Sequence, residues 1–503
     1  MSGEKRLVIF VHGWSVRNTD TYGELPARLR SEAARDPSLG IDVREIWLSQ
    51  YISFHNEVRL EDISRAFDAA IRREFGDALR AGRRFACITH STGGPVVRDW
   101  LQRNYLRTGR RRTPLSHLIM LAPANFGSAL AQLGHSRLAR LRTWFEGVEP
   151  GLGVLDWLEL GSPESLALNL EWLERSAGIV GPQGVFPFVL TGASIDRKLY
   201  DHVNSYTGEM GTDGVVRVAA ANLAFTHVTL AQEAPRHDPA AKAGLRARTL
   251  VADKPRAVDG VPLALIEGRS HSGDAMGIQR SVRDDGRPHP TVTAVLDCLR
   301  VRTLRDYAKL RQTFAARNAD VMARQRVEIE DLPGPFDRTR IHDPCSMLVF
   351  RVRDDQGNPL KDYEIILTAG RDGNPDALPP GFFIDRQRNR RDPGVVTYYI
   401  NHARMTGCGE VRHGERLVRP ALPACEALGL RIVPYPQDGF VHYLPAELTA
   451  SPENLERFVR PHQTTVIDIV LRRVVREGVF RLTRETSKHD FTKAPPGDAI
   501  PSA

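Results

Sequence analysis

The ten residues Phe85-Ala-Cys-Ile-Thr-His-Ser-Thr-Gly-Gly94 decide the fold. The first five form a short apolar run, which predicts a buried strand. The turn that follows places Ser91 just before two glycines and a helix that we expect to begin near Pro95. A serine in a sharp turn between a strand and a helix holds its Oγ exposed at the end of the sheet. The stretch therefore predicts an α/β sheet and a nucleophilic serine.

The residues two positions either side of such a serine are usually small, because strand and helix must pack closely there. Gly93 meets this requirement, but Thr89 stands where a glycine is usual. Threonine is bulkier and β-branched, so we expect a slightly more open turn, with Gly94 helping to make room. The departure affects the fine geometry of the turn and not the class of reaction.

Strands and helices alternate on both sides of this turn, from residue 5 to about residue 300. Apolar runs predict strands at residues 7–11, 43–47, 115–121, 185–190 and 263–266. A buried helix face is predicted where apolar residues recur every four positions, at Ile63, Phe67, Ile71 and Phe75. The pattern predicts the α/β class with a doubly wound, mostly parallel sheet.

Three further regions follow from composition along the chain. Residues 127–180 form an apolar helical insertion, either a packed cap or a mobile lid. Residues 304–344 are typical of a helical linker. Short strands separated by turn signals then predict an antiparallel β-sandwich at 345–485. We thus expect an α/β domain at 1–303 that contains Ser91, a linker at 304–344, a β-sandwich at 345–485, and a flexible tail at 486–503.

Composition excludes several classes of protein. The chain has 503 residues, of which 41% are hydrophobic and 26% charged, so it is not disordered, collagen-like or a coiled coil. A net charge of +8 is mild and favours anionic surfaces such as phospholipid headgroups. Nucleic acid is not an expected partner, because no recognition motif occurs. No P-loop, dinucleotide fingerprint or Cys/His metal spacing occurs, so no cofactor and no metal ion are expected.

The apolar run at 7–11 is too short for a signal peptide, and no run of 18 apolar residues could form a transmembrane helix. The five scattered cysteines indicate reduced thiols, although Cys408 and Cys425 could pair. We therefore expect a protein made in the cytoplasm without a cleavable signal, whose export would need a signal-independent secretion system.

A nucleophilic serine needs a base and an acid that orients the base. His271 follows the strand 263–266 in a loop of small residues, and Asp213 lies in a tight Gly-Thr-Asp-Gly turn. The order Ser91, Asp213, His271 is the order used by the architecture in which the serine occupies a strand-to-helix turn. The alternative acids are Asp196, Asp253 and Asp274, of which Asp196 is the runner-up because it closely follows the strand ending at Leu190.

The tripeptide His12-Gly13-Trp14 directly follows the first predicted strand. Acyl transfer needs preorganised N–H groups that stabilise an oxyanion. We predict that the backbone N–H groups of Thr92 and Trp14 form this oxyanion hole, with Gly13 allowing a close approach. An ordinary turn after a strand ending in a buried His12 is the alternative.

Four motifs together carry a family resemblance. They are Phe10-Val-His-Gly-Trp14, Thr89-His-Ser-Thr-Gly-Gly94, Thr212-Asp-Gly-Val-Val216 and Ser270-His-Ser272. They resemble the α/β-hydrolase fold lipases, above all bacterial lipases and the GPI-inositol-deacylase-like branch, over roughly residues 5–300. The resemblance implies an α/β-hydrolase fold and hydrolysis of a carboxylic ester of a lipid. Some lipases of this family bind structural calcium, but no carboxylate cluster here requires it.

Three functions follow as hypotheses. The first is a lipase or phospholipase acting at a membrane. A signal-less phospholipase with an added β domain resembles antibacterial lipase effectors delivered by contact-dependent secretion machines, which implies a delivery partner and an inhibitory or immunity partner. The second is a soluble cytoplasmic carboxylesterase or thioesterase acting on small acyl substrates. The third is a catalytically idle hydrolase scaffold that binds a partner, against which the complete serine, aspartate and histidine set argues.

Overall fold

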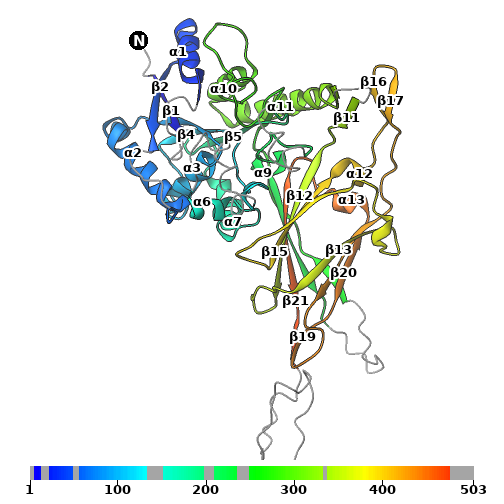
Figure 1. Cartoon of the computed structure of the whole chain (residues 1–503). Coiled ribbons are helices and arrows are strands. Elements are labelled where there is room, and N and C mark those ends of the chain that lie inside the picture. The colour runs from blue at the N-terminus through cyan, green and yellow to red at the C-terminus, as the bar shows by residue number, and fades with distance from the viewer. Residues whose placement is uncertain are drawn as a thin grey trace, which may run out of the picture.

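Six parallel strands form the central sheet of the α/β region in the computed structural model (Figure 1). Their order is β2 (Ile41–Trp47), β1 (Arg6–His12), β3 (Phe85–His90), β4 (Leu115–Leu121), β5 (Phe186–Gly192) and β9 (Leu263–Ile266). The structure describes residues 5–12, 22–48, 56–132, 151–196, 209–234, 248–331 and 337–475. Because every pair in this sheet is parallel, all six carboxyl ends lie at the same edge.

Helices cover both faces of this sheet. Each strand contributes side chains to both buried cores, because successive strand residues point to opposite sides. In β1, Leu7 and Ile9 belong to one buried core, whereas Val8 and Phe10 belong to the other. The first face is covered by α2 (Leu60–Arg80) and α3 (Gly93–Leu101). The second is covered by α1 (Leu25–Arg35), α10 (Pro290–Arg300) and α11 (Leu304–Arg324). The predicted doubly wound sheet is confirmed.

The helix α11 lies in the region expected to be a linker, but it is part of the α/β layers. Its apolar residues Tyr307, Leu310 and Phe314 are spaced three and four apart and lie in the second core. The Tyr307 hydroxyl donates to the carbonyl of Pro187 at 2.7 Å. The short hairpin of β10 (Val327–Asp331) and β11 (Asp337–Ile341) then leads to the β region.

The described residues of the insertion at 127–180 pack against the α/β region. They contain α6 (Leu152–Leu158) and α7 (Pro163–Arg175), and the Trp172 side chain is fully buried in the first core. The side chain of Gln102, beyond the end of α3, donates to the carbonyl of Leu168 at 2.7 Å. Residues 133–150 lie outside the described residues.

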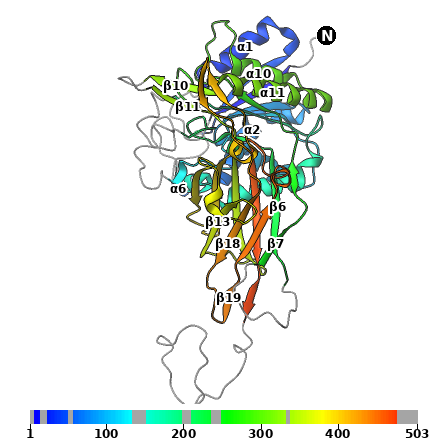
Figure 2. The same ribbon diagram turned by 90° about the vertical axis from the view of Figure 1, so that its right-hand side faces the viewer.

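The second sheet has ten strands and folds into two layers (Figures 1 and 2). Apolar side chains from both layers form one core between them, as expected for a β-sandwich. The strand order is β13 (Tyr363–Ala369), β18 (Leu428–Pro434), β20 (Ala446–Ala450), β7 (Arg248–Ala252), β6 (Phe225–Gln232), β21 (Thr464–Leu471), β12 (Cys345–Asp354), β15 (Val395–Asn401) and β14 (Phe383–Arg388), with β8 (Arg256–Val258) paired to β6. Two further antiparallel pairs are β16 (Val411–His413) with β17 (Arg416–Arg419) and β19 (Val441–Tyr443) with β22 (Arg473–Val475).

This sheet differs from the expectation in two ways. Three of its pairs are parallel, β12 with β21, β21 with β6, and β20 with β7, so it is mixed and not purely antiparallel. The strands β6, β7 and β8 come from residues 225–258, which we expected in the α/β domain. A boundary at residue 303 therefore does not separate the two sheets. Strands supplied by a distant part of the chain need no hairpin to join their partners, which is why they can run parallel.

No helix among the described residues is both long and apolar enough to cross a membrane. All five cysteines are free thiols, including Cys408 and Cys425, for which a disulfide was an open alternative.

Candidate active site

Ser91 lies at the turn between β3 and α3, and its backbone has a φ of 53°. A residue with a side chain rarely adopts this left-handed conformation, because the Cβ atom crowds the backbone. The turn is held in place by its neighbours: the Ser91 N–H donates to the carbonyl of Leu121 at 3.0 Å, and the Ser91 carbonyl accepts from the N–H of Gly94 at 3.3 Å. The strained conformation presents the hydroxyl at the carboxyl edge of the sheet.

Gly93 and Gly94 each make room for a different neighbour of the Ser91 turn. A Cβ atom added to Gly93 would lie 3.2 Å from the Cβ of Thr89, so Gly93 leaves room for the threonine. A Cβ added to Gly94 would lie 2.9 Å from the Cβ of Pro123, so Gly94 lets α3 approach the segment after β4. The bulk of Thr89 is accommodated by its contact with Gly93, while Gly94 serves a different contact.

The structure brings Ser91, His271 and Asp213 into one hydrogen-bonded chain. The Nε2 atom of His271 lies 3.1 Å from Ser91 Oγ, and its Nδ1 atom lies 2.9 Å from Asp213 Oδ2. The loop after β9 carries His271, and the backbone N–H of His271 donates to the Asp213 carbonyl at 2.9 Å. Both side chains are buried. The turn after β3, the loop after β9 and the Asp213 turn thus bring the three side chains together at one edge of the sheet.

The Asp213 carboxylate is fixed by its own turn. Its Oδ1 atom accepts from the N–H groups of Val215 and Val216, at 3.0 and 2.8 Å, which leaves Oδ2 for His271. Of the alternative acids, Asp253 accepts from the backbone of Thr229 in the β region, and Asp274 pairs with Arg280.

Asp196 follows β5 at residues 186–192, and among the described contacts it makes none with His271. Of the four acids considered, Asp213 is the one that contacts the histidine in the described structure.

His90 has a place in the site that sequence reasoning did not give it. Its ring packs on the ring of His271, with the centroids 4.7 Å apart, and its Nε2 atom lies 3.1 Å from the His271 carbonyl. Burial, together with the neighbouring His271, lowers the pKa of His90 well below its usual value. A neutral His90 donates its Nε2–H to that carbonyl and so fixes the loop of His271. Its position beside the serine in sequence was the available signal.

Of the predicted oxyanion hole, the structure describes one side. Thr92 is the residue before the first turn of α3, where backbone N–H groups have no partner within the helix. His12 is the last residue of β1, and β1 lies beside β3 in the sheet. Gly13 and Trp14 lie outside the described residues, so the second donor stays a prediction.

This arrangement is suited to acyl transfer through a covalent intermediate. A hydroxyl in contact with an imidazole, whose other nitrogen contacts a buried carboxylate, is the geometry of an activated serine. Among the described residues, no group of three or more His, Cys, Asp or Glu side chains is placed to hold a metal ion.

Comparison with known proteins gives a match over the whole chain. Phospholipase PlaB from Legionella pneumophila, in a structure determined in complex with thio-NAD, is 39% identical, with a TM-score of 0.83, and the match covers 99% of this chain and 100% of that chain. A second structure of the same phospholipase is 40% identical, with a TM-score of 0.83 and coverage of 97% and 98%. No family model matches the sequence, and a search of curated proteins gives no match.

Identity at this level, extending through both the α/β region and the β region, is far above a likeness of fold alone. The α/β-hydrolase fold and the lipase resemblance expected from the sequence are confirmed. The protein is an ester hydrolase that belongs to the family of the Legionella phospholipase PlaB.

Proposed function

We propose that the protein is a phospholipase that cleaves carboxylic esters with Ser91 as nucleophile, His271 as base and Asp213 as orienting acid. The observation that carries this proposal is the continuous chain from Ser91 Oγ through both nitrogens of His271 to Asp213 Oδ2, with contacts of 3.1 and 2.9 Å. The match to a phospholipase along the full chain supports a lipid ester as substrate.

In the first half of the reaction, His271 Nε2 takes the Ser91 proton as Oγ forms a bond to the ester carbonyl carbon. Asp213 accepts from Nδ1–H, which keeps Nε2 free as the base and stabilises the imidazolium. The backbone N–H groups of Thr92 and Trp14 bind the oxyanion. His271 then returns the proton to the departing alcohol as the bond between the carbonyl carbon and the ester oxygen breaks.

In the second half, water attacks the acyl-enzyme with His271 again acting as base, and the fatty acid leaves Ser91. The buried positions of Asp213 and His271 favour this chemistry, because hydrogen bonds and charges act more strongly away from water.

The experiment that tests the serine is covalent labelling with a fluorophosphonate, read by mass spectrometry of the modified peptide. We expect one label per chain on Ser91 and none on the Ser91→Ala variant, which should also lose hydrolysis of short-chain esters. Thermal unfolding of the variant should match that of the wild type. A label elsewhere, or esterase activity retained by Ser91→Ala, would overturn the assignment.

We infer further that the enzyme acts at a membrane surface, which the net charge of +8 and the phospholipase relative support. The resemblance to secreted lipase effectors extends the proposal to attack on the membrane of a neighbouring bacterium, opposed by an immunity partner. Production of the wild type in the periplasm of a test bacterium should lower its viability, and Ser91→Ala should not. Equal survival would contradict the effector role.

A further inference from the structure

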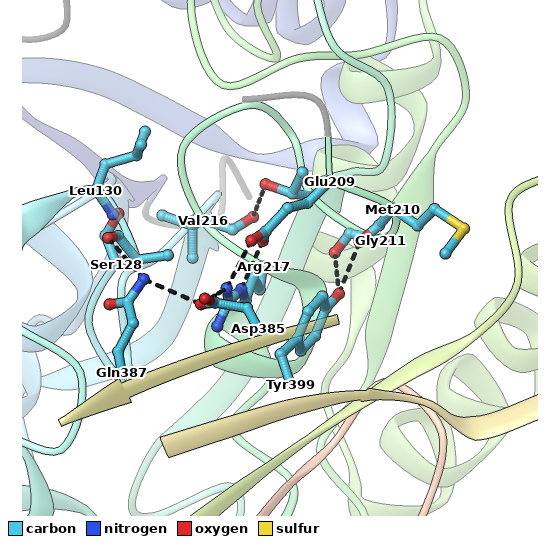
Figure 3. A network of polar contacts seen from close by, with 12 residues as sticks. Ser128, Leu130, Glu209, Met210, Gly211, Val216, Arg217, Asp385, Gln387 and Tyr399 are labelled. Atoms are coloured by element: carbon cyan, nitrogen blue, oxygen red, sulfur yellow. Dashed lines mark hydrogen bonds and ion pairs between the residues drawn. The ribbon is translucent and has the colours of Figure 1, made fainter. Parts of the chain in front are cut away.

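The turn that carries Asp213 is joined to the β region through the buried side chain of Arg217 (Figure 3). The guanidinium of Arg217 donates from Nε and from one terminal nitrogen to the two carboxylate oxygens of Glu209, both at 2.8 Å. The same terminal nitrogen also donates to Asp385 on β14. The Arg217 side chain is 2% exposed, so these ion pairs lie away from water. The charged side chains of Glu209, Arg217 and Asp385, from two distant parts of the chain, thus join the end of the Asp213 turn to β14.

Tyr399 on β15 holds the beginning of the same turn. Its single hydroxyl hydrogen is shared between the carbonyl of Met210, at 2.8 Å from the hydroxyl oxygen, and the carbonyl of Gly211, at 3.2 Å. Its ring lies against the guanidinium of Arg217, whose Cζ atom is 4.2 Å from the ring centroid. Figure 3 shows Tyr399 beside Arg217, with Met210 and Gly211 above it. One side chain of the β region therefore contacts both ends of the turn.

Asp385 and Tyr399 are paired across β14 and β15, so they present their side chains on the same face of the sheet. Gln387, two residues further along β14, donates to Asp385 at 3.0 Å and to the carbonyl of Ala129 at 3.1 Å. On the other side, Ser128 Oγ donates to the carbonyl of Val215 at 2.6 Å. The Asp213 turn is thus held from two directions by groups outside itself.

These contacts set where the turn sits and not its internal shape. The bonds from Val215 and Val216 to Asp213 Oδ1 are local and would survive a shift of the whole turn. The distance from Asp213 Oδ2 to His271 would not survive it, since His271 belongs to a different loop. A displacement of about 1 Å at a catalytic group can lower the rate by about a hundredfold. The contacts from β14 and β15 are therefore placed to matter for the reaction.

We propose that Tyr399 and Asp385 are positioning residues, by which the β region holds the Asp213 turn against His271. The proposal rests on the proposed function, because it takes Asp213 as the acid of the site. It gives the β region a part in catalysis that is independent of any contact with lipid.

The test compares Tyr399→Phe with Tyr398→Phe, its neighbour on the same strand. Phenylalanine at 399 keeps the ring over Arg217 and removes only the hydroxyl. Tyr398 points to the opposite face, where its hydroxyl donates to the carbonyl of Ile365 at 2.8 Å inside the β-sandwich core. Each variant loses one buried hydroxyl and its hydrogen bonding to backbone carbonyls, two carbonyls for Tyr399 and one for Tyr398. The control therefore accounts for any general loss of stability.

The readout is the rate of Ser91 phosphonylation by a fluorophosphonate, in which fluoride leaves and the adduct is stable, expressed per titrated active site and measured beside kcat and KM for a short ester. We expect Tyr399→Phe to lower the phosphonylation rate and kcat about tenfold, with KM and the titrated fraction of active sites unchanged. Tyr398→Phe should retain the wild-type rate per site. Asp385→Asn, which keeps an oxygen acceptor for Arg217 but removes a charge, should fall between them.

A wild-type phosphonylation rate in Tyr399→Phe, or an equal loss in Tyr398→Phe, would overturn the positioning role. A reduced number of active sites with an unchanged rate per site would do the same, because it shows loss of folded protein only. Ser91→Ala run in the same assay separates the two proposals. If Ser91→Ala is unlabelled and Tyr399→Phe is normal, the positioning role alone fails. If Ser91→Ala still labels at the same rate, the proposed function fails as well.

Discussion

Gly93 and Thr89 face each other across the turn of Ser91, so that a Cβ atom on Gly93 would lie 3.2 Å from the Cβ of Thr89. The pair shows how this chain keeps a tight strand-to-helix turn although a threonine, Thr89, stands two positions before Ser91, where a glycine is usual. The space that the lipase pattern usually leaves at residue 89 is supplied from the helix side by Gly93.

Gly93→Ala should therefore destabilise the turn by overpacking, at a cost of about 1–3 kcal/mol in the free energy of unfolding, and it should lower esterase activity. Adding Thr89→Gly should restore activity toward that of Thr89→Gly alone. Urea unfolding and ester hydrolysis check both effects. Gly409→Ala is the control, since no atom would come within 4 Å of the added carbon there. Additive losses in the double variant would show that the two residues do not compete for space.

Asp213→Asn should reduce kcat by about 10³- to 10⁴-fold while the protein stays folded. The asparagine amide would donate to His271 Nδ1 and favour the tautomer in which Nε2 carries the proton and cannot act as base. Steady-state kinetics with a short ester gives kcat and KM separately, and only kcat should change strongly. Asp253→Asn is a matched control in the β region, where the carboxylate accepts from the backbone N–H of Thr229. Near-normal turnover in Asp213→Asn would move the acid to another residue.

Gly211 can be tested against Tyr399 as a pair. Gly211 has a φ of 66°, and a Cβ there would lie 2.6 Å from the Tyr399 hydroxyl. Gly211→Ala should lower activity more than tenfold, and the loss in the double variant with Tyr399→Phe should be smaller than the product of the two single losses. Gly373→Ala controls for backbone strain alone, because Gly373 has a φ of 65° and its nearest contact would be 3.9 Å away. Independent effects would indicate that the turn does not rest on Tyr399.

His117 makes stability depend on pH. It is buried in β4, donates to the carbonyl of Val301 at 2.9 Å, and burial lowers its pKa to about 4. In the unfolded chain the His117 side chain has a pKa of about 6.5, so between pH 6.5 and 4 it binds more protons there than in the folded protein. The stability that comes from holding His117 neutral is therefore lost as pH falls through that window. His117→Gln keeps a donor and does not titrate.

The slope of the unfolding free energy against pH should thus be smaller in His117→Gln, by at most about 1.4 kcal/mol per pH unit. The comparison is made by urea unfolding at several pH values between 4 and 6.5. Other buried histidines titrate in both proteins and cancel in the difference. Parallel curves for the two proteins would show that His117 is not held neutral.

The sequence patterns predicted the α/β layers well because each buried strand is a local apolar run, as at 115–121 and 263–266, whose bounds match β4 and β9. They could not show that residues 225–258 join the second sheet, since an apolar strand does not reveal which partner it pairs with. The three residues Ser91, Asp213 and His271 were named from motif order, and the structure places them in contact.

The features of the site that the sequence did not reveal depend on contacts between residues far apart in the chain. Arg217 and Asp385 are 168 positions apart, and no spacing rule connects them. His90 stands next to Ser91 in the sequence. Its contact with His271 depends on the fold, which places the ends of β3 and β9 at the same edge of the sheet. Trp14, the second predicted oxyanion donor, stays a prediction.

The most direct test of a lipid-cleaving Ser91 is hydrolysis of phospholipid vesicles, with the products identified by mass spectrometry, for the wild type and Ser91→Ala. We expect the wild type to release free fatty acid together with lysolipid, and Ser91→Ala to release neither while binding and unfolding as the wild type does. Equal release by Ser91→Ala would contradict the proposed nucleophile. No release from vesicles by a wild type that still cleaves soluble short esters would contradict the phospholipase and indicate a soluble esterase.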